Sequence, residues 1–127
     1  MAELIYPQLS YKLVGILFKV DNQIGYGHRE SLYQSAISKL LIDSKIGYQE
    51  QLKCEIKIDN QSIKKYFVDF LIDNKVILEI KAGDRFNKAN IAQIYDYLKA
   101  NSLKLGIIAN FTKQGVKFKR VIYKPRQ

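Results

Sequence analysis

The chain of 127 residues predicts an α/β fold of the α+β kind, with elements in the order α-α-β-β-β-α-β-β. Up to about residue 45, apolar residues recur at the spacing of a helix, and they then alternate with polar residues as in a strand. A third helical pattern follows, and after it a short, fully apolar run of the kind found in strands inside a sheet. Together these patterns predict helices packed on a sheet.

The first two elements are predicted as amphipathic helices. Residues 9–20 place apolar groups at helical spacing, and residues 21–27 then break the pattern with two glycines. A second helix is expected over residues 29–45. Its buried stripe is predicted to consist of Leu32, Ala36, Ile37, Leu40 and Leu41.

Three strands are predicted next, as an antiparallel meander. They cover residues 49–58, 63–72 and 75–81, with turn residues at 59–62 and 73–74. A helix over 87–100 and strands over 105–109 and 116–123 complete the order. Because no repeat or linker interrupts the chain, residues 1–127 are expected to form one domain with its own core.

The bulk composition excludes several classes of protein. Hydrophobic residues make up 47% of the chain and charged residues 26%, which is typical of a globular protein and not of a disordered one. No apolar stretch is long enough to span a membrane, and the N-terminus lacks the layout of a signal peptide. Cys54 is the sole cysteine, which excludes an internal disulfide and a CxxC zinc site. These features predict a cytoplasmic protein.

The positive charge is concentrated near the C-terminus. The net charge is +9, and residues 101–127 carry seven basic residues and no acidic residue. This distribution predicts contact with a polyanion, most simply a phosphate backbone, although a solvated surface would have the same composition. The basic residues proposed to bind nucleic acid are Arg85, Lys88, Lys113, Lys117, Lys119 and Arg120.

Three charges interrupt the apolar pattern of the second and third predicted strands. They are Asp69, Glu79 and Lys81, and a charge in a buried strand is costly unless it is paired or bound to a metal. Glu79 and Lys81 are two residues apart and therefore share a face of their strand. Because the two strands are antiparallel and joined by a short turn, Asp69 is expected to lie close to Glu79.

This arrangement predicts a site for a hard divalent cation, Mg²⁺ or Mn²⁺. Such cations prefer oxygen ligands, which Asp69, Glu79 and the backbone carbonyl of Ile80 would supply. The cation would lower the pKa of a bound water and offset phosphate charge. Lys81 would hold the attacking water or stabilise the transition state. The alternative is an exposed strand edge with a glutamate and a lysine in water.

Two further residues are candidates for the same site. Glu30 begins the second predicted helix, where it would either complement the helix dipole or reach over the sheet as another ligand of metal or water. Gln93 lies on the third predicted helix, where it would brace Lys81 or contact a phosphate, or would simply be solvated.

At this point the chain resembles a known family. The spacing Gly27-x-x-Glu30-x-x-Tyr33 matches the signature of the GxxExxY proteins, a group within the PD-(D/E)XK nuclease-like superfamily. The Glu79-Ile80-Lys81 triplet, residues 93–98 and residues 106–111 are also similar to segments of that family. The resemblance implies a restriction-endonuclease-like αβββαβ core, with a mixed sheet flanked by helices, an extra N-terminal helix and a C-terminal strand.

The resemblance also implies a site and a reaction. Its catalytic residues would be Glu30, Asp69, Glu79, Lys81 and Gln93, with the metal held by Asp69, Glu79, Ile80 and Glu30. The expected function is a magnesium-dependent nuclease acting on DNA. A non-catalytic nucleic-acid-binding module and an RNA-directed nuclease remain alternatives, and a homodimer is possible by analogy with small members of the superfamily.

Overall fold

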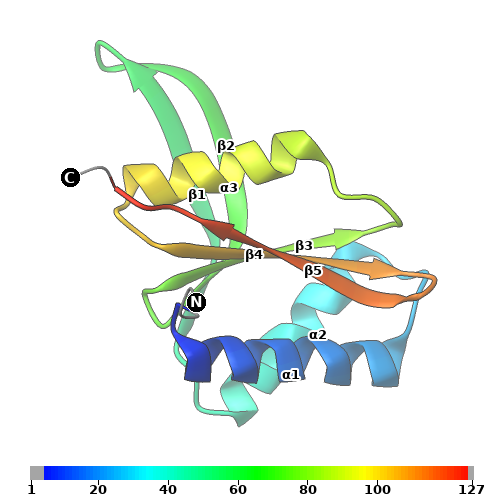
Figure 1. Cartoon of the computed structure of the whole chain (residues 1–127). Helices are drawn as coiled ribbons and strands as arrows, with labels where there is room; N and C mark the ends of the chain where they lie inside the picture. Colours follow the sequence, from blue (N-terminus) through cyan, green and yellow to red (C-terminus); the bar gives the residue numbers. More distant parts are fainter. Residues whose placement is uncertain (1–4, 126–127) are drawn as a thin grey trace.

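The computed structural model describes residues 5–125, which form three helices and five strands (Figure 1). The helices are α1 (Pro7–Ile24), α2 (Glu30–Asp43) and α3 (Lys88–Ala100), and the strands are β1 (Tyr48–Ile58), β2 (Gln61–Ile72), β3 (Val76–Ala82), β4 (Leu105–Thr112) and β5 (Gly115–Ile122). The predicted order of elements is confirmed. No helix among residues 5–125 has the length and apolar character needed to cross a membrane.

The five strands form one mixed sheet in the order β1-β2-β3-β4-β5. Neighbouring strands are antiparallel except β3 and β4, which are parallel. Parallel neighbours need a crossover connection, and α3 supplies it. The predicted α+β class, with a mixed sheet flanked by helices, is therefore confirmed.

The helices cover the two faces of the sheet separately. On one face, α1 and α2 pack on alternate residues of β3, among them Leu78 and Ile80. On the other face, α3 packs through Ile94 and Leu98 on Ile77 of the same strand. Figure 1 shows α1 and α2 on one side of β3–β5 and α3 on the other, with the β1–β2 hairpin extending past α3.

Two helix predictions are corrected by the structure. The first helix continues to Ile24, beyond the predicted break at residue 21, and ends where Gly25 takes a positive φ of 77° and donates its N–H to the carbonyl of Asp21. In α2, Leu32 is 43% exposed, whereas Tyr33 is fully buried. The buried stripe therefore lies on Tyr33 and its helical neighbours, because the tyrosine ring stacks on Phe111 of the sheet.

Tight turns set the lengths of the two hairpins. Asp59 and Asn60 both have positive φ, which is the conformation of a two-residue type I′ turn. Asp73 and Asn74 also have positive φ, within the three-residue connection from Ile72 to Val76. The first turn is therefore shorter than the predicted residues 59–62, and β2 begins at Gln61. At the other end of the sheet, β4 continues past the predicted Ala109 to Thr112.

Candidate functional site

Strands β2 and β3 separate at Asp69 and Glu79. Their ladder ends with the pair formed by Phe70 and Leu78. Beyond it, the Asp69 N–H donates to Glu79 Oε1 at 2.6 Å, and the Ile80 N–H donates to Asp69 Oδ2 at 2.8 Å. Two carboxylates thus replace the backbone carbonyls as acceptors, which satisfies backbone donors that the opening would otherwise leave unpaired.

The buried face of β2 also changes at this point. Val68 packs in the cluster with α3, whereas Phe70 packs in the cluster with α1 and α2, although residues two apart normally share a face. Across the ladder, Gln51 of β1 has a positive φ of 52°. The two strands therefore turn at the level of Asp69, and the turn is what opens the sheet beside β3.

Burial and a neighbouring charge change the acidity of Glu79. Its side chain is almost fully enclosed, and burial is the main cause that raises its pKa to about 8, followed by repulsion from Asp69. The Asp69 N–H and the Lys81 ammonium act in the opposite direction. In the absence of a cation, the pair therefore holds a proton near neutral pH.

Lys81 lies beside this pair and reaches solvent. Its Nζ is 3.9 Å from Glu79 Oε2, and its side chain is 30% exposed. The sheet register places Lys81 next to Asn110 of β4, and Asn110 opposite Lys117 of β5. The structure thus brings Asp69, Glu79 and Lys81 together, with the ammonium group toward the surface.

Two glutamines that the sequence analysis did not identify connect the carboxylates to α2. Gln51 Nε2 donates to Asp69 Oδ1 at 3.2 Å and to Gln34 Oε1 at 3.1 Å. Both glutamines occupy polar positions of amphipathic elements, where a solvated side chain is the ordinary expectation. The pairing of β1 with β2 brings Gln51 to Asp69, and Gln34 of α2 reaches the site through Gln51.

Glu30 is the first residue of α2 and is exposed. It lies one helical turn before Gln34, so both side chains are on the same side of the helix. Within the described residues, no hydrogen bond or ion pair joins Glu30 to Asp69 or Glu79, and residues 5–125 contain no cluster of three or more His, Cys, Asp or Glu able to hold a metal. The structure therefore places Glu30 near the site but outside the carboxylate pair.

Tyr33 fixes the loop that leads into Glu30. Its hydroxyl donates to the carbonyl of Gly25 at 2.6 Å and accepts the N–H of His28 at 3.3 Å. Its ring stacks on Phe111 with a centroid distance of 4.1 Å, and Gly27 has a positive φ of 96°. The Gly27-x-x-Glu30-x-x-Tyr33 spacing thus has a structural reason: the glycine makes the turn and the tyrosine anchors it.

The remaining catalytic candidate, Gln93, is bonded through its backbone. Gln93 is half-buried on α3, and its backbone carbonyl accepts the Tyr66 hydroxyl at 2.8 Å. Within residues 5–125, no hydrogen bond joins the Gln93 side chain to Lys81.

Asn110, which the sequence analysis did not identify, is buried and donates its amide to the carbonyls of Gly83 and Arg85, so it holds the loop after β3.

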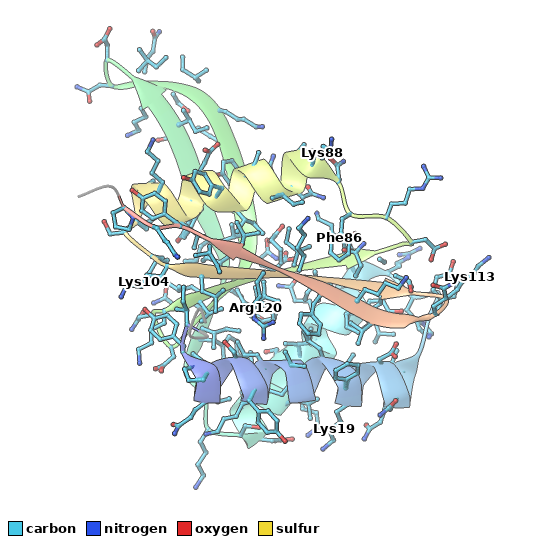
Figure 2. All side chains as sticks on the ribbon, in the orientation of Figure 1. Lys19, Phe86, Lys88, Lys104, Lys113 and Arg120 are labelled. Carbon is cyan, nitrogen blue, oxygen red and sulfur yellow. The ribbon has the colours of Figure 1, made fainter. Side chains whose placement is uncertain are left out.

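The basic residues fall into two groups. Lys117 and Lys119 are exposed and share the α3 face of the sheet with Lys81, because Val121 of the same strand packs against α3 and side chains alternate. Arg120 lies on the α1 side (Figure 2), where its guanidinium is 5.4 Å from the centre of the Phe118 ring. The structure thus separates Arg120 from these two lysines.

The other predicted nucleic-acid contacts lie in the β4–β5 turn and in the segment that leads from β3 into α3. Lys113 is exposed in the β4–β5 turn (Figure 2). Its N–H donates to Asp84 Oδ1 at 3.3 Å. Arg85, in the loop before α3, and Lys88, the first residue of α3, are also exposed. Because Asp84 belongs to the loop after β3, Lys113 lies beside the segment that leads from Lys81 to α3.

Comparison with known proteins agrees with this architecture. The family described as the PD-(D/E)XK nuclease superfamily matches residues 7–121. The crystal structure of SSO0001 is similar, with a TM-score of 0.55 and 17% sequence identity, over 95% of this chain and 59% of that one. At this identity the likeness shows the fold alone, and the chain spans about three-fifths of SSO0001. No curated protein matches the chain.

Proposed function

Because the chain belongs to the PD-(D/E)XK nuclease superfamily, we propose that it is a metal-dependent nuclease that hydrolyses phosphodiester bonds of nucleic acid, DNA in particular. The family supports a nuclease-type function. The single observation that carries the proposal is the opening between β2 and β3, where the carboxylates of Asp69 and Glu79 meet beside Lys81.

The donor set at the opening fits a hard divalent cation such as Mg²⁺ or Mn²⁺. Asp69 and Glu79 supply carboxylate oxygens. Burial, followed by repulsion from Asp69, raises the pKa of Glu79 to about 8, and a bound cation would offset both effects. Mg²⁺ is commonly held by one or two carboxylates and keeps several waters, so two carboxylates with the Ile80 carbonyl are sufficient. When bound, the cation would supply an activated water and offset phosphate charge.

Each residue of the candidate site has a distinct role in this proposal. Asp69 and Glu79 are fixed by hydrogen bonds to backbone N–H groups, so little reorganisation is needed to bind the cation. Lys81, beside Glu79 and open to solvent, holds the attacking water or stabilises charge on the phosphate. Glu30 and Gln93 are proposed to join once substrate is bound, since each lies on a helix that flanks the sheet.

We also infer membership in the GxxExxY group. The support is the anchored turn described above, in which Gly27 takes a positive φ and Tyr33 holds the loop before Glu30. If the group's motif serves to place this glutamate, Tyr33→Phe should lower cleavage while leaving the fold intact.

The function is tested by incubating the protein with supercoiled plasmid, branched duplex, single-stranded DNA and RNA, each with Mg²⁺, Mn²⁺ or EDTA. We expect cleavage that requires the metal. The Glu79→Gln and Lys81→Met variants should each lose at least 10²-fold in rate, the size of effect seen when one transition-state contact is removed.

A matched control comes from the exposed ion pair of α2, in which Lys39 Nζ lies 2.8 Å from Asp43 Oδ2. The Lys39→Met and Asp43→Asn variants should cleave as fast as the wild type. The proposal fails if no substrate is cut with either metal, or if cleavage survives in Glu79→Gln and Lys81→Met. Binding that persists in EDTA without any cleavage would support the non-catalytic binding module.

A further inference from the structure

Within residues 5–125, no helix covers one face of the β1–β2 hairpin. Tyr66 and Val68 pack in the cluster with α3, so strand alternation turns Phe67 and the residues two and four positions before it to the other side. There Phe67 is 56% exposed and Ile63 is 61% exposed. The outward hairpin face consists of Lys53, Glu55, Lys57, Ile63, Lys65 and Phe67.

This face begins close to the carboxylate site along the strands. Phe67 pairs with Lys53 across the hairpin, two residues beyond the level at which Gln51 contacts Asp69. Two residues of strand span about 7 Å, which is close to the rise of two stacked nucleotides at about 3.4 Å each. A strand leaving the site along the hairpin would therefore reach Phe67 within about two nucleotides.

The charges of the outward hairpin face favour an anion. Glu55 is shared by three lysines, with its carboxylate 3.6 Å from Lys53, 3.2 Å from Lys57 and 3.8 Å from Lys65. The hydrogen bond from Lys57 is the main cause that lowers the pKa of Glu55, so this carboxylate remains ionised. One carboxylate cannot neutralise three ammonium groups, and all three lysine side chains are more than half exposed.

We infer that the outward hairpin face binds a single strand of nucleic acid, with an unpaired base stacked on Phe67 and flanking phosphates on Lys53 and Lys65. The inference rests on the proposed function and names the form of the substrate. An exposed aromatic ring between lysines is the combination used to bind single strands, because every base can stack and every phosphate carries charge. An apolar protein partner would match Phe67 and Ile63 but not the ammonium groups between them.

The test measures binding in EDTA, where cleavage does not interfere, using one fluorescein-labelled 20-mer as a single strand and as a duplex. Phe67→Ala should weaken binding of the single strand about tenfold, in line with the loss of one stacked base, and binding of the duplex less than threefold. Phe67→Trp should bind as the wild type does. Tyr11→Ala, which removes another exposed aromatic residue on α1, should change neither affinity.

A second arm addresses the lysines. The double variant Lys53→Gln/Lys65→Gln should lower the slope of log K against log salt for the single strand by about 1.4, since each phosphate contact contributes about 0.7. Lys19→Gln/Lys104→Gln, whose lysines lie elsewhere on the surface, should leave the slope unchanged (Figure 2).

Three results would overturn the inference: Phe67→Ala binding the single strand like the wild type, equal losses for single strand and duplex, or a change of Phe67→Ala from dimer to monomer in light scattering. The last result would assign the face to a second copy of the chain.

The hairpin inference and the proposed nuclease function fail separately. Normal single-strand binding by Phe67→Ala with intact wild-type cleavage removes only the hairpin inference, whereas Phe67-dependent binding without cleavage removes only the nuclease.

Discussion

Opposing effects set the pKa of Glu79. Burial and the charge of Asp69 favour the protonated carboxyl group, whereas the Asp69 N–H and Lys81 favour the charged carboxylate. Burial dominates, so the folded protein binds this proton more tightly than the unfolded chain does. Protonation of Glu79 therefore stabilises the metal-free fold. This contribution is complete below about pH 4.5 and is lost as the pH rises through about 8.

The metal-free protein should accordingly become less stable between pH 6 and pH 8.5. Thermal unfolding in EDTA should show a lower melting temperature at pH 8.5, and Glu79→Gln, which cannot ionise, should lose most of this dependence. Glu30→Gln is the matched control because Glu30 is exposed, and it should keep the wild-type profile. A wild-type profile that is flat, or that rises with pH, would contradict the assignment.

Individual residues differ in how far sequence alone can identify them. Asp69, Glu79 and Lys81 were recognisable because charge within an apolar strand is costly and needs an explanation. Gln34 and Gln51 were not, because polar residues on amphipathic elements are ordinary and their contacts depend on how α2 and β1 meet β2 in the fold. Glu30 was nominated by a motif, and its exposed position shows that a motif locates a residue without fixing where its side chain binds.

At the scale of elements, the packing of α3 on β4 depends on one glycine. A Cβ added to Gly106 would lie 2.5 Å from Cγ2 of Ile94, which is closer than side chains approach in real structures. Gly106 therefore permits the crossover helix to sit directly on the sheet. Because α3 connects β3 to β4, this contact also supports the register that places Lys81 beside Asn110.

Gly106→Ala should lower the free energy of unfolding by about 1–3 kcal/mol, the usual cost of overpacking a core. Urea denaturation would measure the change. Gly15→Ala provides the comparison, since Gly15 lies in α1 with open space around it, and there alanine should add about 0.5–1 kcal/mol of stability. A Gly106→Ala protein as stable as the wild type would show that α3 moves freely on the sheet.

Hydrophobic periodicity predicted the elements themselves because helices and strands each bury one face with a characteristic repeat. The residues at which these helices and strands end were harder to predict. The turn at Asp59 and Asn60 is tight because both residues adopt positive φ, and nothing local distinguishes it from a longer turn. The parallel pairing of β3 with β4 also lay outside the local pattern, since it depends on how α3 crosses the sheet.

For the whole molecule, the net charge of +9 matters through its distribution over the faces of the sheet. Lys117 and Lys119 share the face of Lys81, whereas Arg120 packs over Phe118 on the side of α1. A count of basic residues near the C-terminus could not separate these two groups, because the separation follows from strand alternation.

Duplex DNA binding should therefore respond to the two lysines. We expect Lys117→Gln/Lys119→Gln to reduce the slope of log K against log salt by about 1.8, since each phosphate contact on a duplex contributes about 0.9. Fluorescence anisotropy at salt concentrations from about 50 to about 200 mM would measure this slope. Lys19→Gln/Lys104→Gln serves as the control, and equal slopes for the two double variants would refute the assignment.

The order of the strands has a consequence for solubility. Within residues 5–125, β1 and β5 each pair on one side only, which leaves two rows of backbone groups that a second chain could extend. Both rims carry exposed lysines, including Lys53 and Lys57 on one and Lys117 and Lys119 on the other. Charge at a sheet edge discourages the addition of foreign strands. The lysines proposed to hold phosphates thus also oppose aggregation. Bound nucleic acid would neutralise these lysines and so would favour edge-to-edge association of two chains.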